Sequence, residues 1–565
     1  MSKDGSKLIQ NILSEADSYS SLEIIESYIQ KGQDLSNLPT QPLYVALKSL
    51  PTDVVATTLS KFSQEQRRVF LDLDLWKRDD IDPNSFHYWI ETYSKVQDEK
   101  IKSEFLNSSE FSIFLKGRMS VWTFDVEDPE YPDHDNYFLT EDNLLLFEFE
   151  EDYPYFAEIK QFVRDLYTEK GVEKAYQHLF KVVSEGFMTM QEEEYRFKKH
   201  RLNDLGFVDY FDALEMSNSF PSVSHIDLFI RKKETITPKL DPSSVNQCLD
   251  KFSVIAFKNN FDSISTELAK LNDDTRVNFL QFNFTRLINA TLTLNDALKD
   301  GSVAMTRVGR ETSNTIKLGL SYVKNLIKEE SLEITDQGIF SSFDFVDIYR
   351  IGRSLISLTQ KSLKRAYAQS GFTSENDSFL GEIFTSTIEN SFYGEVKYID
   401  NRVENKTRLV EDAETFKNWK SEVELLVKTL PFLTSFYKTF NELKSSGQLM
   451  DDFYLNYGID DIDFEALMIS TLINHSNDNL SKSSGMKMGV SIDELRSFSS
   501  KVLKNDSLLL QCANNFKNTF GLDEVIGFEN FLVDIIKYHL SGYDLEELDE
   551  SEFKHVGGPL LFKAK

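Results

Sequence analysis

The chain has 565 residues, of which 41% are hydrophobic and 45 are Phe, an aromatic content that excludes a largely disordered protein. Its 92 Asp and Glu outnumber its 62 Lys and Arg, so the formal net charge is −30. Such a charge repels phosphate backbones and anionic membranes at long range. We therefore expect no nucleic-acid binding, and we expect a protein partner, for which a basic surface is one option.

Cysteine usage and hydropathy indicate a reducing compartment. Cys248 and Cys512 are the two cysteines, and neither belongs to a CxxC pair, so we expect buried free thiols and no disulfide framework. The N-terminal residues contain no apolar segment of a signal peptide, and no 18-residue stretch is apolar enough to cross a bilayer. The sequence predicts a cytoplasmic protein with no membrane insertion.

Residues 1–105 are predicted to form a superhelix of short helices. Two short apolar patterns precede residue 35, and from Leu38 onward a new helix start recurs about every twelve residues. Ser63-Gln-Glu-Gln66 fits a capping box, which marks a helix N-terminus. Short helices stack in pairs because each is too small to bury its own apolar face.

Residues 106–234 are expected to combine an acidic β insert with helices. From Met119 to Ile159 the chain has thirteen acidic residues and no Lys or Arg. Two β-like stretches, MSVWTFDVE and LLLFEFEED, flank the turn-forming sequence DPEYPDHDN, which predicts a hairpin or a small sheet.

Residues 235–244 contain two prolines and few apolar residues, so we predict a linker there. Residues 245–545 carry long amphipathic patterns, which favour a helical bundle, and residues 546–565 are predicted to form a tail. The expected bundle helices span about 245–270, 273–299, 302–330, 340–369, 411–445, 461–480, 491–504 and 507–540. The predicted fold class is mainly α: an N-terminal short-helix superhelix, a small acidic β-hairpin insert and a larger C-terminal helical bundle.

The chain contains two unusual sequence strings, FLDLDLWKRDD at residues 70–80 and YRFKKHRLNDLGF at residues 195–207. With these strings and weaker matches at Leu318-Gly-Leu320 and Gly352-Arg-Ser-Leu355, most of the chain resembles an uncharacterised bacterial family, the domain of unknown function numbered six-one-seven-eight. The resemblance implies no activity, cofactor or site residue, because none is assigned to that family.

Residues 38–100 are also similar, in their pattern of short helices, to the helical cytosolic N-terminal domain of MgtE-type magnesium channels. This similarity implies a fold and no transport, because no channel portion is predicted. It leaves open a regulatory sensor whose acidic surface would respond weakly to Mg²⁺.

The acidic insert contains a candidate metal site at Asp133, His134 and Asp135. Hard cations bind several oxygens at once, and His134 would add a nitrogen that suits a transition metal. The ligand order of an EF-hand and its glycine are absent. A solvated acidic loop is therefore the competing interpretation.

A docking surface is a third interpretation of the same insert. Trp122, Tyr131 and Tyr137 would supply contact area, and the carboxylates would select a basic partner. Trp76, which four charged residues follow, is a further partner-binding candidate. The alternative for Trp76 is a place in the core.

Two further groups of charged residues have both a functional and a plain interpretation. Glu193 and His200 share one helix face and could act as an acid–base pair, or belong to a helix stabilised by ion pairs. The span 305–365 has ten basic and seven acidic residues, so it is relatively basic. It could receive an acidic segment of the same chain or a phosphorylated ligand, or be an ordinary solvated surface.

The sequence contains no GxGxxG, P-loop, GxSxG or HExxH motif. We assign no catalytic residue, no metal and no cofactor from the sequence. The favoured function is a non-enzymatic interaction or regulatory scaffold, and the alternative is an enzyme with an unrecognised acidic or metal-dependent site. The oligomeric state stays open.

Overall fold

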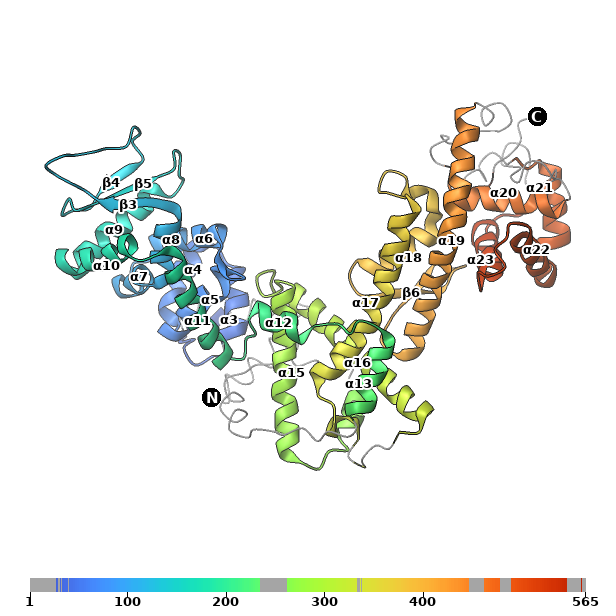
Figure 1. Ribbon diagram of the computed structural model, residues 1–565, viewed down its shortest axis with the longest axis horizontal. Helices are drawn as coiled ribbons and strands as arrows, with labels where there is room; N and C mark the ends of the chain where they lie inside the picture. Colours follow the sequence, from blue (N-terminus) through green and yellow to red (C-terminus); the bar gives the residue numbers. More distant parts are fainter. Residues whose placement is uncertain are drawn as a thin grey trace. The chain divides into compact units, whose positions relative to one another are not determined.

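The computed structural model describes residues 27–28, 31, 33–38, 40–233, 262–332, 336, 338–446, 462–477, 489–545 and 560. These residues form 21 α-helices and three small antiparallel sheets (Figure 1), so the predicted mainly α fold class is confirmed. Within the same residues, no helix combines the length and the apolar character that crossing a bilayer requires. The predicted linker at 235–244, Cys248, nearly all of the predicted helices before residue 35 and nearly all of the tail lie outside the described residues.

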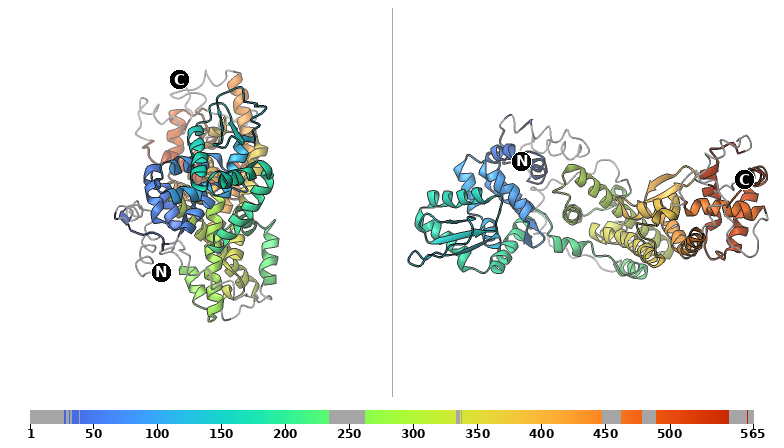
Figure 2. Two further views of the ribbon diagram at one scale, coloured as in Figure 1. Left: turned by 90° about the vertical axis from the view of Figure 1, so that its left-hand side faces the viewer. Right: turned by 90° about the horizontal axis from the view of Figure 1, so that it is seen from above.

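The chain divides into two compact units. Unit 1 consists of Met1–Asn218, Arg231–Ser313 and Glu333–Arg350, and unit 2 consists of Ser219–Ile230, Asn314–Leu332 and Ile351–Lys565. Two long helices, α16 (Ser302–Glu330) and α17 (Phe345–Ser370), contribute residues to both units. Figure 2 shows the elements from two further sides.

Unit 1 begins with short helices, which the recurring helix-start signals predict. They are α3 (Thr40–Lys48), α4 (Thr52–Thr58), α5 (Gln64–Asp74), α6 (Pro83–Ser94), α7 (Glu99–Leu106) and α8 (Ser109–Arg118), with the strands β1 (Trp76–Lys77) and β2 (Asp80–Ile81) after α5. The predicted capping box is confirmed, because the Ser63 hydroxyl accepts from the backbone N–H of Gln66 and the Gln66 side chain accepts from that of Ser63. Phe70, Trp89 and Phe105 belong to the shared core of these helices.

The acidic segment forms a three-stranded antiparallel sheet. Its strands are β3 (Met119–Thr123), β4 (Tyr137–Leu139) and β5 (Leu145–Phe149), and β5 lies in the middle. Phe147 and Phe149 are buried, and the ring of Phe149 meets Phe156, the first residue of α9 (Phe156–Lys170), edge-on. Helix α10 (Val172–Ser184) contacts β3, so the sheet is anchored on helices (Figure 1).

The remaining helices of unit 1 close its core. They include α11 (Phe187–Asp204), α12 (Tyr210–Met216), α14 (Asp262–Leu268) and α15 (Asp274–Leu294), while α13 (Val223–Lys233) belongs mostly to unit 2. Helix α11 packs against α5 and α8, and α12 packs against α15. Asn289 of α15 donates to the carbonyl of Gly206 at 2.8 Å and accepts from the Gln41 side chain at 3.0 Å. Helix α15 is therefore tied to both the short helices and the α11–α12 connection.

Unit 2 contains the longest of the described helices. Beyond α17 it has α18 (Gly381–Phe392), β6 (Lys397–Asn401), β7 (Lys406–Leu409), α19 (Ala413–Ser445), α20 (Phe464–Ser476), α21 (Ile492–Phe498), α22 (Asp506–Thr519) and α23 (Phe528–Leu540). Helices α16 and α17 approach closely at Gly352, where a Cβ atom would lie 2.1 Å from the carbonyl oxygen of Thr315. Any other residue at this position would force the two helices apart.

Candidate functional site

The acidic aromatic loop, residues 124–137, connects β3 to β4 and presents aromatic rings among carboxylates. The ring centroids of Phe124 and Tyr131 are 5.3 Å apart, and those of Tyr131 and Tyr137 are 5.8 Å apart. Tyr131 is 52% exposed. The exposed acidic residues of the loop are Asp125, Glu127, Asp128, Glu130, Asp133 and Asp135. The loop thus combines a chain of three rings with a strongly negative surround.

The sheet fixes the base of this loop. Trp122 lies on the edge strand β3 opposite Leu146 of β5, and it is half-buried, as is Tyr137 at the start of β4. Phe138, the next residue, is buried and stacks on Phe147 at a centroid distance of 5.1 Å. Both ends of the loop therefore continue into strands whose side chains belong to the core.

His134 contacts neighbours in both the loop and the sheet. Its Nδ1 accepts from the backbone N–H of Asn136 at 3.1 Å, so in the neutral ring Nε2 carries the proton. Nε2 lies 3.2 Å from a carboxylate oxygen of Glu148 on β5. Asp133 and Asp135 are exposed on either side. The structure thus gives His134 a role in anchoring the loop to the sheet, and a metal site at these three residues stays a prediction.

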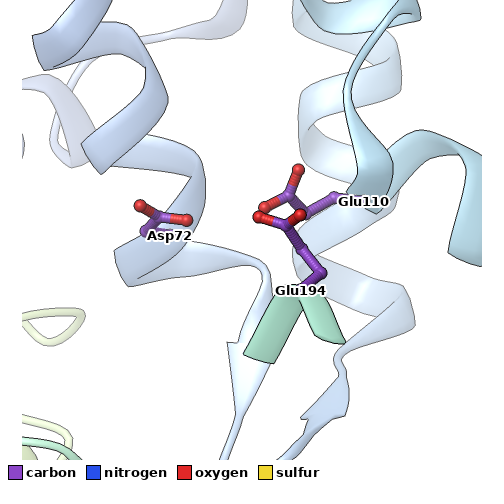
Figure 3. Close-up of side chains that lie close together, drawn as sticks. All are labelled: Asp72, Glu110 and Glu194. Atoms are coloured by element: carbon purple, nitrogen blue, oxygen red, sulfur yellow. The ribbon is translucent and has the colours of Figure 1, made fainter. Parts of the chain in front are cut away.

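A different set of carboxylates converges in the interior of unit 1. Asp72 of α5, Glu110 of α8 and Glu194 of α11 are all buried, and one oxygen from each lies within 4.8 Å of the others (Figure 3). Among the described residues, these three carboxylates are the group of potential metal ligands whose ligand atoms all lie this close together. The sequence alone does not predict this cluster, because its members are far apart along the chain and belong to three different helices.

Arg201 makes the closest cationic contacts of this carboxylate cluster, and Arg68 Nη2 lies 3.7 Å from Glu194. The Nη2 of Arg201 donates to Asp72 at 2.6 Å and to Glu194 at 2.7 Å and lies 3.4 Å from Glu110, while its Nε donates to the second oxygen of Asp72 at 2.8 Å. Two parallel N–H donors on one carboxylate are the strongest geometry for such a pair. The guanidinium of Arg201 thus compensates part of the negative charge of the three carboxylates.

Burial shifts the pKa values of Glu110 and of the neighbouring Lys198 toward neutral pH. Removal from water, together with the charges of Asp72 and Glu194, raises the pKa of Glu110 to about 8. Removal from water lowers the pKa of Lys198 to about 8, although Asp209 and Asp72 oppose this shift. Glu110 is 2% exposed and Lys198 is 7% exposed. Both groups therefore have a pKa near 8 and lie in the interior of unit 1.

Lys198 joins the cluster to the first of the unusual sequence strings. Its Nζ lies 5.1 Å from the ring centroids of both Trp76 and Tyr195, and it is 3.5 Å from the carbonyl oxygen of Arg78. The Tyr195 hydroxyl donates to Asp209 at 2.7 Å. The strings at residues 70–80 and 195–207 therefore lie directly against each other. Trp76 is 4% exposed in this arrangement, and its proposed partner contact stays a prediction.

Asp74, two positions after Asp72, is the centre of a second buried group on α5. It accepts from the Tyr44 hydroxyl at 2.9 Å, from Lys48 Nζ at 2.9 Å and from the indole N–H of Trp89 at 2.8 Å. Its exposure is 0%. A buried carboxylate is stable only with such partners, so these contacts fix the position of α5 relative to α3 and α6.

Glu193 and His200 lie on the exposed side of α11. On the same side, Glu192 and Arg196 form the ion pair that their spacing predicts, at 2.5 Å. The same spacing favours a pair between Glu194 and Lys198, but Glu194 accepts a hydrogen bond from Arg201 instead. The acid–base interpretation of Glu193 and His200 stays a prediction.

Unit 2 has its own buried acidic site, at the start of α20. Glu465 is 0% exposed; it accepts from the backbone N–H of Ile383 at 2.9 Å, and its other oxygen lies 2.6 Å from Nε2 of His539. Burial and the charge of Glu465 raise the pKa of nearby Asp463 to about 7. Gly381 has φ of +80°, and a Cβ there would lie 2.5 Å from the Glu465 side chain.

Comparison with known proteins gives one family. A model of a family of unknown function, DUF6178, matches residues 7–454. No curated protein and no solved structure matches the chain significantly. The carboxylate cluster of unit 1 and the acidic aromatic loop lie inside the matched range, whereas Glu465 and His539 lie beyond it.

Proposed function

We propose that this chain, which belongs to the family of unknown function DUF6178, is a non-enzymatic cytoplasmic interaction protein. Its acidic aromatic loop binds a basic protein segment. The description of the family names no activity, so the proposal rests on the surface of the chain itself. One observation carries this proposal, namely the row of rings from Phe124 through Tyr131 to Tyr137 inside a stretch without Lys or Arg. Aromatic rings supply contact energy at low entropic cost, and uncompensated carboxylates select a cationic partner.

The setting of the loop supports this proposal. Binding is weaker when a free loop must be ordered first. Here His134 fastens the loop to Glu148, and Tyr137 continues into a strand that pairs with β5. Lys or Arg side chains of a partner could then lie over the ring faces, an arrangement worth about 0.5–2 kcal/mol per contact.

The buried cluster around Arg201 supports a structural role rather than catalysis. Its acid–base groups are enclosed by α5, α8 and α11, whereas a catalytic acid or base must reach its substrate. The enzyme alternative and the Mg²⁺ sensor suggested by residues 38–100 gain no specific support from the geometry, and both stay predictions.

The test uses the full chain and a fluorescently labelled peptide of alternating Lys and Ser, with a Glu–Ser peptide as the negative probe. A loop variant reverses three exposed charges that have no ion-pair partner among the described residues. Its substitutions are Glu127→Lys, Asp128→Lys and Glu130→Lys. We expect binding of the Lys–Ser peptide that weakens at least tenfold in the loop variant and weakens steeply with salt.

A matched control carries the same change of charge at exposed positions of unit 1 away from the loop. Its substitutions are Glu185→Lys, Glu193→Lys and Glu215→Lys. We expect the control to bind the peptide within a factor of about two of the unaltered chain, because long-range charge alone is screened over a Debye length of about 10 Å at 0.1 M salt. Equal losses in both variants would refute the loop as the binding site.

A further inference from the structure

The described part of unit 2 contains a surface that complements the acidic aromatic loop in charge. Between Ile348 and Ser374 the chain has five basic residues and no Asp or Glu. The acidic segment at residues 119–159 has the opposite composition, with thirteen acidic residues and no Lys or Arg. The chain as a whole has a net charge of −30. Each segment is therefore left without compensation along its own sequence.

Three of these basic residues form a stripe on α17. Lys361, Lys364 and Arg365 are three and four positions apart, so they share one helix face. All three are exposed, and none has an ion-pair partner among the described residues. Leu363 on the other side of the helix is 0% exposed, so packing holds α17 with the basic stripe outward. We use the name basic stripe for Lys361, Lys364 and Arg365.

The surroundings of the stripe favour close approach by aromatic rings. Within one turn of the stripe, Ala368 is exposed and offers no bulk that would hold a ring away. Arg and Lys side chains bind ring faces as well as carboxylates. The acidic aromatic loop presents both kinds of group in its exposed Tyr131 and its neighbouring carboxylates.

We propose that the basic partner is a second copy of this chain, whose basic stripe on α17 binds the acidic aromatic loop of the first. This inference rests on the proposed function and names the partner for the same loop. The net charge of −30 makes two copies repel at most relative orientations, so a local basic stripe is what permits attractive contact. Charge complementarity of this kind sets both the orientation and the salt dependence of association.

The experiment is a charge exchange between two full-length variants, followed by sedimentation velocity at low ionic strength. One is the loop variant, with Glu127→Lys, Asp128→Lys and Glu130→Lys. The stripe variant carries Lys361→Glu, Lys364→Glu and Arg365→Glu. In the loop variant alone, the three new Lys cancel the charge of the three acidic residues left in the loop, Asp125, Asp133 and Asp135. In the stripe variant alone, loop and stripe are both negative. Self-association of either variant should therefore weaken at least tenfold relative to the unaltered chain.

An equimolar mixture of the two variants should associate again. The unaltered acidic loop of the stripe variant then meets the unaltered basic stripe of the loop variant, a complementary pair of surfaces that neither variant has on its own. Recovery on mixing can come only from contacts between copies. A control with Lys417→Glu, Lys428→Glu and Lys438→Glu changes three exposed positions of α19 by the same charge, and it should self-associate like the unaltered chain.

Three outcomes would overturn the proposal. An unaltered chain that sediments as a monomer at all concentrations removes the second copy as partner. Compaction that depends on both surfaces but not on protein concentration assigns the stripe to the loop of its own chain. Loss of association in the loop variant but not in the stripe variant assigns another surface as partner. In each case Lys–Ser peptide binding by the unaltered chain would show that the proposed function survives, whereas its absence would end both.

Discussion

Arg201 donates to three buried carboxylates and is the residue whose loss we expect to cost most in unit 1. In Arg201→Met the apolar stem is kept, but Asp72 remains buried without its hydrogen-bonded counter-charge, and Glu194 keeps the longer contact with Arg68 at 3.7 Å. Breaking one partner out of a buried ion pair costs about 3–5 kcal/mol, which denaturant unfolding would measure as a lower midpoint. Arg196→Met on the same helix removes an exposed pair and should cost less than about 1 kcal/mol. Similar losses in the two variants would contradict the role assigned to the cluster.

Glu110 should make the stability of unit 1 depend on pH. Its folded pKa of about 8 lies above the ordinary value of 4.5, so the folded chain holds a proton that the unfolded chain releases. Stability is then full below about pH 4.5 and falls as pH rises toward 8. We expect Glu110→Gln to remove this loss of stability. The substitution should leave the free energy of unfolding almost unchanged at pH 5 and raise it by roughly 2–4 kcal/mol above pH 8.

Denaturant unfolding across pH 5 to 9 measures the difference between the Glu110→Gln variant and the unaltered chain. This difference separates the effect of Glu110 on stability from that of Lys198. Because the folded pKa of Lys198 is depressed, Lys198 makes stability rise with pH between pH 8 and its ordinary pKa of 10.5. Glu193→Gln, an exposed substitution on α11, should show no such trend. A flat difference for Glu110→Gln would show that Glu110 is ionised in the folded chain at neutral pH.

Only part of this residue-level chemistry could be predicted from the sequence. The Glu192–Arg196 pair follows from helical spacing, and so does the Ser63 capping box, because both partners are neighbours along the chain. Arg201 and Asp72 are separated by 129 positions, and one sequence contains no signal for such a distant pair. Glu194 is an example. Helical spacing favours a pair with Lys198, but Glu194 accepts a hydrogen bond from Arg201 instead.

At the scale of elements, the crossing of α16 and α17 depends on one missing side chain. Gly352→Ala would place a methyl group 2.1 Å from the carbonyl oxygen of Thr315, so the helices must separate. We expect a loss of about 1–3 kcal/mol, even though alanine favours helix more than glycine by about 1 kcal/mol. Gly542→Ala, where a Cβ has open space, is the matched control and should be close to neutral in thermal unfolding. A stabilised Gly352→Ala chain would contradict the close crossing.

Helical periodicity predicted long elements well and their interruptions poorly. The expected helices at 302–330 and 411–445 correspond closely to α16 and α19. The single helix expected over 507–540 is two, α22 and α23, because the chain turns at Gly521 and Gly527, both with positive φ. The hairpin of β6 and β7 was not predicted, since a short pair of strands between long helices leaves only a weak alternation.

At the scale of the whole molecule, two compact units imply two unfolding transitions. Calorimetry should resolve them, because large chains with separate cores depart from two-state behaviour. We expect Arg201→Met to lower the transition of unit 1 and Gly381→Ala to lower that of unit 2, where the added Cβ would clash with Glu465 and the positive φ would be strained. Their effects should add in the double variant. A single transition that both variants lower equally would mean that the units unfold together.

The general character of the molecule was accessible from composition and periodicity, and its candidate interaction surface was accessible from charge. Residues 119–159 contain no Lys or Arg and several Tyr and Phe. In the structure they include a three-stranded sheet and the acidic aromatic loop that joins two of its strands. What composition could not supply is which residues are buried together, since burial depends on how distant helices pack.

The two aspartates of α5 have a consequence for the length of that helix. Asp72 and Asp74 are two positions apart and therefore point about 200° away from each other, one toward Arg201 and the other toward Tyr44, Lys48 and Trp89. Inserting or deleting one residue between Ser63 and Asp72 would turn both carboxylates by about 100° and detach each from its donors at once. Helix α5 should thus accept conservative replacements on its surface while tolerating no change in its number of residues.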